Sequence, residues 1–385
     1  MVLLSLSPVG LKRLLRVLAC NCIEDQLVIN HSKSKVIVFS RKRRKYRWQV
    51  NGTSINQVPS YRYLGILFHK SGLWRSQVES ARAIALRSSK ALLSFFCSKG
   101  GHYVPSAIRV FTAKVISKLL YGAQVSNYNS HLPFEIIQTK FLRSILAVPP
   151  CISNAKLRYI TGMPSIESQI WILKFRYWMK LIFEPVGLSP LILIDNFQSK
   201  WKKSLSLQLT SLGFSIPYVI SLGRSKALLA ITQRILDVDF QNVLSCLGPR
   251  FASSPSLKPF TSAQFLYHLS IPRLRKAFTM AKFDVLPSAL LEGRFNRIPQ
   301  TESYCPCDSG AIETAGHVLL ECRFYTSLRS HFIIPLFQKF PSRDKKFFAQ
   351  YLLADINSPI TCKVMNFFAA AIDTRRDLMS KEPLT

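Results

Sequence analysis

Three cysteines and one histidine lie within a short segment of the sequence, at Cys305, Cys307, His317 and Cys322. Three thiols and one imidazole are the donor set of a closed tetrahedral zinc site, which leaves no position open for water. The residues from His317 to Cys322 fit a helical turn that presents the last two donors on one side. The sequence therefore predicts a structural zinc ion in a zinc knuckle.

Two other interpretations of this segment stay open. Free cysteine is often buried, so the four residues are also compatible with unconnected core positions. A disulfide is less favoured, because the nine cysteines are scattered over 385 residues and no secretory leader is recognisable. This cysteine usage indicates a reducing compartment, and we expect an intracellular location, nuclear or cytoplasmic.

The charge of the chain indicates a polyanionic partner. There are 52 Lys and Arg against 20 Asp and Glu, a formal net charge of +32. Residues 1–150 alone carry 23 basic and 4 acidic side chains. Nucleic acid, RNA or DNA or both, is the partner that such a balance predicts. An anionic membrane surface is the second candidate, although no stretch reaches the roughly 18 uninterrupted apolar residues of a transmembrane segment.

The N-terminal elements alternate between strand and helix patterns. Ser7 and Pro8 are favoured types at a helix N-cap and first position, and leucines at helical spacing follow them. Asn51-Gly52 predicts a tight hairpin turn. Short apolar runs predict strands over residues 1–6, 36–39, 46–50, 53–55 and 59–68.

From Trp74 onward the apolar period is helical. We expect three amphipathic helices, from Trp74 towards Gly100, from Pro105 through Leu119, and over residues 133–148. Further helices follow, in which the aromatic side chains at 171, 175 and 178 belong to a core. Residues after 335 form a final helix or two and a polar tail.

Two N-terminal motifs resemble a known family. Asn30 with Lys33-Ser-Lys35, and then Tyr-Arg-Tyr-Leu-Gly-Ile at 61–66, resemble the last palm motifs of a non-LTR (LINE-type) retrotransposon reverse transcriptase. The C-x-C…H…C segment is similar to the zinc-binding segment that follows the polymerase in that family. The resemblance extends from about residue 1 to about residue 335.

The resemblance implies an α+β fold with a small antiparallel palm remnant, a helical thumb and connector, and a zinc knuckle. We expect a palm remnant and primer-grip strand at 1–70, a thumb at 71–150, a connector at 151–285, the zinc-knuckle region at 286–335 and a C-terminal helix and tail at 336–385.

The parent activity is RNA-directed DNA polymerase, which uses two magnesium ions held by paired aspartates. In the family these aspartates precede a strand that resembles residues 2–5, so their turn would lie before Met1. The acids of the first 150 residues cannot replace them, because the adjacent Glu24 and Asp25 point in different directions and Glu79 and Glu135 belong to separate segments. We therefore expect no polymerase activity from this chain alone.

Binding residues follow from the same resemblance and from charge. Lys33 or Lys35 corresponds to the lysine that assists pyrophosphate departure, and Tyr63 and Gly65 to a turn that holds the primer terminus. The alternative for the two lysines is a solvated entry to a strand. The alternative for the Gly65 segment is a strand in which the glycine allows a neighbour to approach closely. The densest basic run of the sequence consists of Arg41, Lys42, Arg43, Arg44 and Lys45. We expect this run to contact nucleic-acid phosphates, to direct nuclear import, or to be a solvated loop.

The sequence thus predicts a reverse-transcriptase fragment that binds RNA or DNA without catalysis of its own. Arg294, Arg297 and Arg323 are further candidates for RNA contacts, and Phe324 and Tyr325 either stack on bases or pack the knuckle. The first alternative is a non-enzymatic, zinc-stabilised interaction module for nucleic acid or protein. The second is a membrane-surface protein with basic amphipathic helices.

Overall fold

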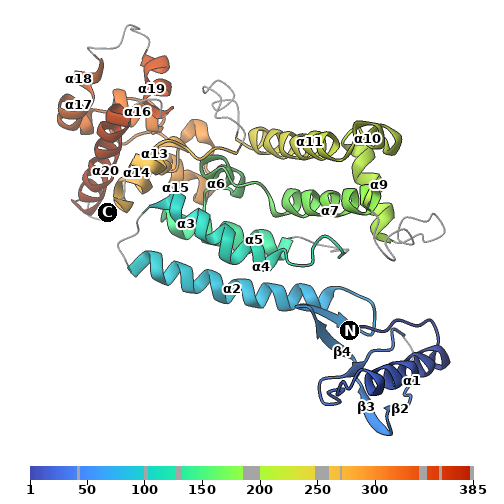
Figure 1. The fold of residues 1–385 in the computed structure, drawn as a ribbon. Helices are drawn as coiled ribbons and strands as arrows, with labels where there is room; N and C mark the ends of the chain where they lie inside the picture. The colour runs from blue at the N-terminus through green and yellow to red at the C-terminus, as the bar shows by residue number, and fades with distance from the viewer. Residues whose placement is uncertain are drawn as a thin grey trace.

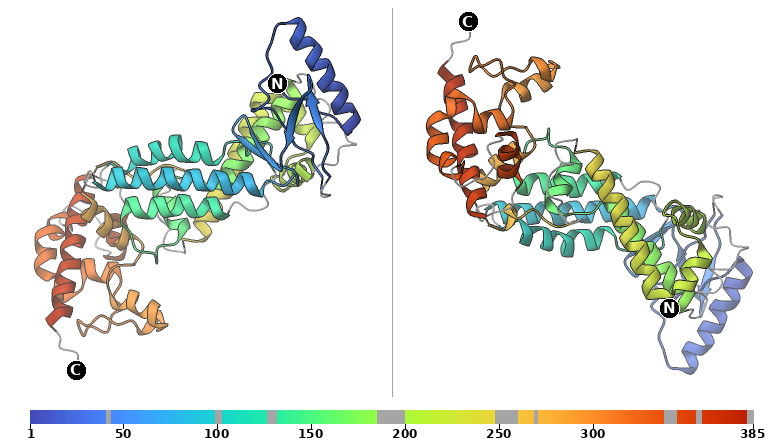
Figure 2. Two further views of the ribbon diagram at one scale, coloured as in Figure 1. Left: turned by 90° about the horizontal axis from the view of Figure 1, so that it is seen from below. Right: turned by 90° about the horizontal axis from the view of Figure 1, so that it is seen from above.

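The computed structural model describes residues 1–40, 44–98, 103–126, 132–184, 200–247, 260–268, 271–337, 345–354 and 358–381. Helices dominate these residues, and the named strands all precede residue 70. The molecule is elongated, with a small sheet and α1 at one end and the C-terminal helices at the other (Figures 1 and 2). The α+β expectation is therefore confirmed at the level of a mostly helical protein with a small N-terminal sheet.

Helix α1 (Pro8–Glu24) begins as predicted. The Ser7 hydroxyl accepts a hydrogen bond from the backbone N–H of Gly10 at 3.0 Å, and Pro8 occupies the first turn. Because proline has no N–H to satisfy, it costs nothing at that position. Leu15 and Ala19 then face the sheet and share a small core with Trp48, Val50 and Ile55.

The sheet beside α1 has the strand order β1-β3-β2. Strands β2 (Trp48–Val50) and β3 (Thr53–Gln57) form the predicted antiparallel hairpin, whose turn residues Asn51 and Gly52 both have positive φ. Strand β1 (Lys35–Val36), however, pairs with β3 in parallel. The sheet is therefore mixed, and the expectation of an antiparallel arrangement is wrong for β1.

Another strand prediction is wrong. Residues 1–6 do not form a strand, and Leu4 is 72% exposed. An apolar run without a neighbouring strand has no partner for its backbone groups.

Residues 59–68 form a hairpin instead of one strand. Strand β4 (Ser60–Tyr63) turns at Leu64 and Gly65, which have φ of 46° and 81°, into β5 (Ile66–His69). Positive φ at both central residues is typical of a type I′ turn, whose twist matches that of paired strands.

The three helices expected after Trp74 are present. The first is α2 (Arg75–Ser98) and the third is α5 (Leu132–Leu146). The second consists of α3 (Val104–Phe111), the π-helical η1 (Thr112–Ile116) and α4 (Ser117–Leu119). Phe111 of this segment stacks on Phe141 of α5 with ring centroids 4.0 Å apart, so aromatic packing joins the second helix to the third.

The remaining elements are helical. The middle of the chain forms α6 (Asn154–Thr161), α7 (Ile166–Phe183), α9 (Lys200–Ser211), α10 (Ile216–Leu222), α11 (Arg224–Ser245), α13 (Phe265–His268) and α14 (Pro272–Lys282). The C-terminal part forms α15 (Ala289–Asn296), η2 (Gln300–Glu302), α16 (Ala315–Leu320), η3 (Arg323–Tyr325), α17 (Thr326–Phe332), α18 (Ile334–Phe337), α19 (Lys345–Leu353) and α20 (Ser358–Lys381).

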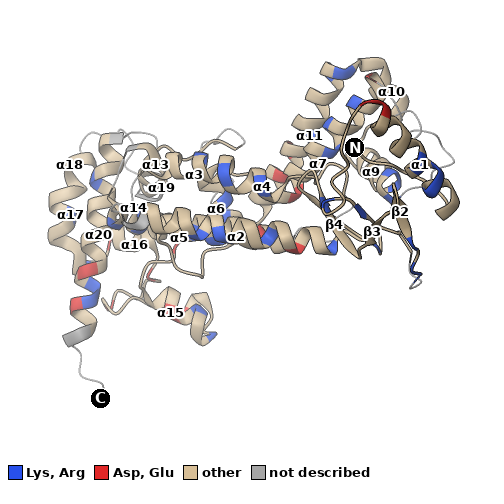
Figure 3. Cartoon of the chain, turned by 60° about the horizontal axis from the view of Figure 1, so that its bottom comes forward, with Lys and Arg blue, Asp and Glu red and all other residues tan. Residues whose placement is uncertain are grey.

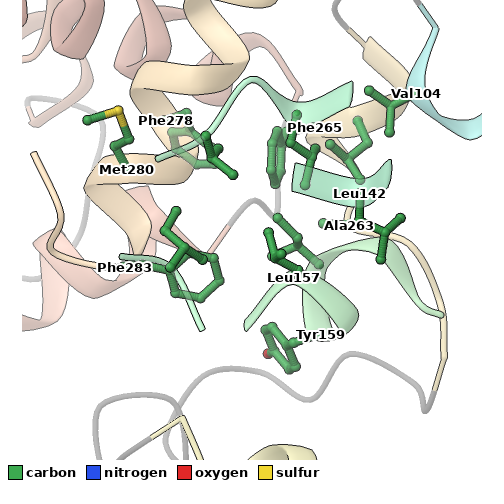
Figure 4. Packing of buried hydrophobic residues seen from close by; sticks show 14 of the residues in the cluster. Val104, Leu142, Leu157, Tyr159, Ala263, Phe265, Phe278, Met280 and Phe283 are labelled. Atoms are coloured by element: carbon green, nitrogen blue, oxygen red, sulfur yellow. The ribbon is translucent and has the colours of Figure 1, made fainter. Parts of the chain in front are cut away.

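Two hydrophobic cores support these helices. The larger one joins α2–α6 to α13, α14 and the C-terminal helices. Figure 4 shows part of it, where Phe265 and Phe278 lie near Leu142 and Leu157. The smaller core lies between α7, α9, α10 and α11 and includes Phe175 and Trp178, so the prediction that these aromatic residues are buried is confirmed.

A buried carboxylate and a half-buried one join the helices of the middle region. Asp239 of α11 pairs with Arg158 of α6 at 2.9 Å and accepts the backbone N–H of Ser165 at 2.8 Å. Glu135 of α5 accepts the N–H of Ile166 at 2.6 Å, at the start of α7. Carboxylates favour the positive end of a helix dipole, so these contacts stabilise the start of α7, whose N-cap is Ser165.

Gly162, which ends α6, carries a first prediction. Its φ is +67°, and an added Cβ would lie 2.7 Å from the backbone carbon of Thr261. We expect Gly162→Ala to lower the free energy of unfolding by about 1–3 kcal/mol from backbone strain alone, with more from this clash. Urea denaturation of the full chain measures it. Gly213→Ala is the control, because that residue has φ of +86° with open space around it; an equal loss in both variants would contradict the role of the close approach.

Candidate metal centre and nucleic-acid interface

A short hairpin brings the first two cysteines of the C-x-C motif back towards α16. The backbone N–H of Cys305 donates to the carbonyl of Ala311 at 2.8 Å, next to an antiparallel bridge between Tyr304 and Ile312. Asp308 and Gly310 both have positive φ, which reverses the chain. The third cysteine, Cys322, follows the end of α16, so the two halves of the motif meet.

The structure brings the four predicted ligands together. Their donor atoms all lie within 4.8 Å of one another, and all four residues are buried. The Sγ atoms of Cys305 and Cys322 are 3.7 Å apart, and the Sγ of Cys307 is 3.3 Å from Nε2 of His317. A tetrahedron with metal–sulfur bonds of about 2.3 Å has edges of about 3.8 Å. The cluster can therefore hold a metal ion, and it is not a disulfide, whose sulfurs would be about 2.05 Å apart.

The protonation of the thiols depends on the surroundings of each. Burial raises the pKa of Cys305 and of Cys322. Burial opposes ionisation of Cys307 as well, but hydrogen bonds from Ser309, together with Cys305 and His317, lower its pKa to about 6. One thiolate is thus favoured by the protein itself. The other two need a cation beside them, because an uncompensated buried charge is costly.

Polar groups around the cluster orient its ligands. Nδ1 of His317 lies 3.4 Å from Oε2 of Glu321, which leaves Nε2 directed towards the cysteines. The Thr314 hydroxyl accepts the N–H of His317 and caps α16. Carboxylates placed on the second nitrogen of a ligating histidine are a recurrent feature of metal sites. The i, i+4 spacing of His317 and Glu321 was a signal for this contact in the sequence.

Glu313 is a residue of this region that no sequence motif marks. Its side chain is 1% exposed, and Oε2 accepts the N–H of Ala289 at 2.7 Å and pairs with Arg375 of α20 at 3.1 Å. Burial raises its pKa, and the Ala289 N–H and the Arg375 guanidinium act in the opposite direction. Both partners lie outside the C-x-C…H…C segment, so the sequence contained no local signal for this contact.

The predicted RNA contacts around the knuckle divide into exposed and structural residues. Tyr325 is 2% exposed and belongs to the core, so the stacking alternative is wrong for it. Phe324 also packs against the core. Arg323 is exposed but pairs with Asp308, and Arg294 donates to the carbonyl of Asp284 at 3.1 Å. The two aromatic residues therefore pack the region, whereas RNA contacts by the exposed arginines stay a prediction.

The N-terminal candidates lie on the small sheet and its entry. Lys33 is exposed, and its carbonyl accepts a hydrogen bond from the Tyr61 hydroxyl at 2.9 Å; Lys35 is half-buried in β1. Arg44 and Lys45 are exposed at the entry to β2, where Gln57 bonds to the Arg44 carbonyl at 2.7 Å. Arg41, Lys42 and Arg43 lie outside the described residues.

Tyr63 and Gly65 lie in the β4–β5 hairpin. The carbonyl of Leu64 accepts a hydrogen bond from the Tyr121 hydroxyl at 2.7 Å, and an added Cβ at Gly65 would be 3.0 Å from Cε1 of that ring. Gly65 therefore has a close neighbour, as the structural alternative predicted. Arg62 donates to Ser80 of α2 at 2.7 Å, so the hairpin is held against the helical body.

Lys and Arg residues recur along α2, α3, η1 and α4, where Figure 3 colours them blue. We use the name basic face for the exposed residues among them, Arg82, Arg87, Lys90, Arg109, Lys114 and Lys118. Nζ of Lys118 lies 3.3 Å from the Ser88 hydroxyl, which places the two helical segments side by side. Between residues 75 and 119 the sequence has one acid, Glu79, and Arg75 pairs with it at 2.9 Å.

The other acids of the first 150 residues lie on separate elements. Glu24 and Asp25 are exposed at the end of α1, and Glu135 caps α7. Among the residues that the structure describes, the Cys/His cluster is the one group of three or more His, Cys, Asp or Glu side chains that could hold a metal ion. No single described helix is long and apolar enough to cross a membrane; α9 and α10 pass that test only as a pair bent by 79°.

The fold and the site define a mostly helical protein with a small N-terminal sheet and a buried cluster of three cysteines and one histidine. Comparison with known proteins assigns no family to it: no family model matches the chain, and no curated protein matches it.

Proposed function

We propose that the chain is a zinc-stabilised nucleic-acid-binding protein derived from a non-LTR reverse transcriptase. The basic face is the observation that carries this proposal. Its six cations are exposed and lie on elements whose one acid is already paired. A surface of one sign attracts a polyanion, whereas ordinary solvated faces mix both signs.

The reverse-transcriptase origin rests on the two N-terminal motifs and on the order of parts. The sheet with its hairpin is followed by three packed helices and, later, by the metal cluster, which is the order of palm, thumb and zinc knuckle in that family. Zinc is the metal we propose for the cluster, because three thiolates and one imidazole suit a closed zinc site. Its role is structural, and a reducing nuclear or cytoplasmic compartment fits the free thiols.

The basic face would bind nucleic acid through the phosphate groups of the nucleic acid, and this binding needs no catalytic residue. Arg and Lys neutralise phosphate charge and release counterions, so affinity falls steeply with salt. Phosphate contacts position a protein on nucleic acid without reading its sequence. We therefore expect binding to RNA and DNA with little sequence preference. No residue of this chain is assigned to nucleotidyl transfer.

A salt titration tests this function. For the triple variant Arg87→Gln, Lys114→Gln, Lys118→Gln, we expect weaker binding to a labelled duplex. Its slope of log K against log salt should be smaller by about 0.9 for each phosphate that is no longer neutralised, so by up to about 2.7. Fluorescence anisotropy of the full chain measures both quantities.

The control removes the same charge elsewhere. Lys226, Arg234 and Arg376 are exposed on α11 and α20, and their replacement by Gln should leave the slope nearly unchanged. Equal effects of the two triple variants, or binding by the wild type that is insensitive to salt, would contradict the proposal. If the protein sediments with anionic vesicles even in the presence of excess RNA, the result would instead favour the alternative that it binds a membrane surface.

A further inference from the structure

We infer that metal binding controls the docking of the C-terminal helix α20, through the buried ion pair between Glu313 and Arg375. This inference rests on the metal site of the proposed function and concerns its coupling to the rest of the chain. Arg375 lies on α20, far along the sequence from the cluster, and its side chain is 5% exposed.

The backbone around Glu313 is held on both sides by residues that lie two or three positions before a candidate metal ligand. Its N–H donates to the carbonyl of Ser303 at 3.2 Å, in the hairpin that carries Cys305. The next residue, Thr314, caps α16 through the N–H of His317. Without a metal ion, the three buried thiols lose the charge that holds them together, and no coordinate bonds reinforce the hydrogen bond between Cys307 of the hairpin and His317 of α16. The position of the Glu313 carboxylate therefore depends on the metal.

Arg375 in turn depends on Glu313. A buried cation that loses its carboxylate is strongly destabilised, because desolvation is no longer offset by the ion pair. Helix α20 packs along α14 and places Phe367 and Phe368 in the large core. Movement of Glu313 thus weakens the docking of an entire helix.

A second route joins the same parts. Arg329 of α17 donates to the carbonyl of Cys322 at 2.6 Å and to that of Leu319 at 3.1 Å. Helix α17 packs against α20. Displacement of Cys322 would therefore reach α20 through α17 as well. The metal cluster and α20 form one cooperative unit.

Linkage makes the coupling reciprocal: if metal favours docking of α20, docking favours metal. Arg375→Gln should therefore weaken zinc binding although it removes no ligand. We expect a loss of about tenfold in affinity, as for other residues that support ligands indirectly. Competition with a chromophoric chelator measures it on the full chain.

Arg376→Gln is the matched control, because Arg376 is the next residue on α20 and its side chain is 74% exposed. It should leave zinc affinity unchanged. If Arg375→Gln folds poorly, the double variant Glu313→Met, Arg375→Met replaces the ion pair by apolar side chains of similar volume. In that variant the route through Glu313 is absent, so zinc removal should disturb α20 less than in the wild type.

Hydrogen exchange of the full chain, with zinc and after chelation, tests the inference directly. We expect deuterium uptake to rise together in residues 303–322 and in α20, while α11 is unchanged. A rise in 303–322 with no change in α20, a uniform rise that includes α11, or equal zinc affinity of the Arg375 and Arg376 variants would overturn the inference. Absence of zinc from the wild-type protein would instead overturn the proposed metal site, and neither result depends on nucleic-acid binding.

Discussion

Cys307→Ser is expected to abolish zinc binding and to unfold the region around the cluster. Wild-type protein should contain one zinc ion per chain. A structural zinc ion contributes about 10–16 kcal/mol to folding in small zinc-binding peptides, which is comparable to the whole stability of a typical domain. Serine has no comparable anionic donor at neutral pH, so the fourth ligand is lost. Elemental analysis and hydrogen exchange of residues 303–325 measure the two effects.

The comparison variant is Cys246→Ser, since Cys246 is exposed and lies at the end of α11. It should keep both the zinc ion and the exchange protection of the wild type. Zinc retained in the Cys307 variant, or a soluble wild-type protein that contains no metal, would refute the site.

Phe111→Ala is expected to lower the free energy of unfolding by about 3–5 kcal/mol, the usual cost of deleting a buried aromatic side chain. Phe111 is fully buried and stacks on Phe141, at the point where α3 passes into the π-helical turn. The cavity would lie between α3, which carries part of the basic face, and α5, so nucleic-acid binding should be lost at a lower temperature than in the wild type. Urea denaturation followed by circular dichroism measures the change in stability.

Phe95→Ala serves as the reference, because Phe95 lies on α2 and is 57% exposed. A surface substitution usually changes stability by no more than about 0.5 kcal/mol. A loss in the Phe111 variant as small as that of the reference would mean that this core does not support the helical body.

The candidate metal ligands could be predicted because their chemistry is local. Three thiols and an imidazole within one segment meet the requirements of a metal without reference to the rest of the chain. The hairpin at Asn51-Gly52 and the start of α1 at Ser7-Pro8 were predictable for the same reason, since a turn type or an N-cap depends on a few adjacent residues. The structure confirms both.

The strand predictions failed where pairing was not local or where a turn lacked its usual residue types. Residues 1–6 have a strand-like sequence but pair with no neighbouring strand. Residues 59–68 were expected to be one strand because the turn at Leu64-Gly65 lacks the Asn or Asp that usually marks it. The parallel pairing of β1 with β3 likewise depends on how the chain returns between them.

The charge of the chain, its helical periods and the identity of the four candidate metal ligands follow from the sequence, because each is a property of residue types and spacing. Three other features follow from the packing of separate elements: α2 and α4 lie side by side as one basic face, Tyr325 is core, and Glu313 meets Arg375. Such pairings depend on how helices pack across a shared core, for which neither partner carries a local signal.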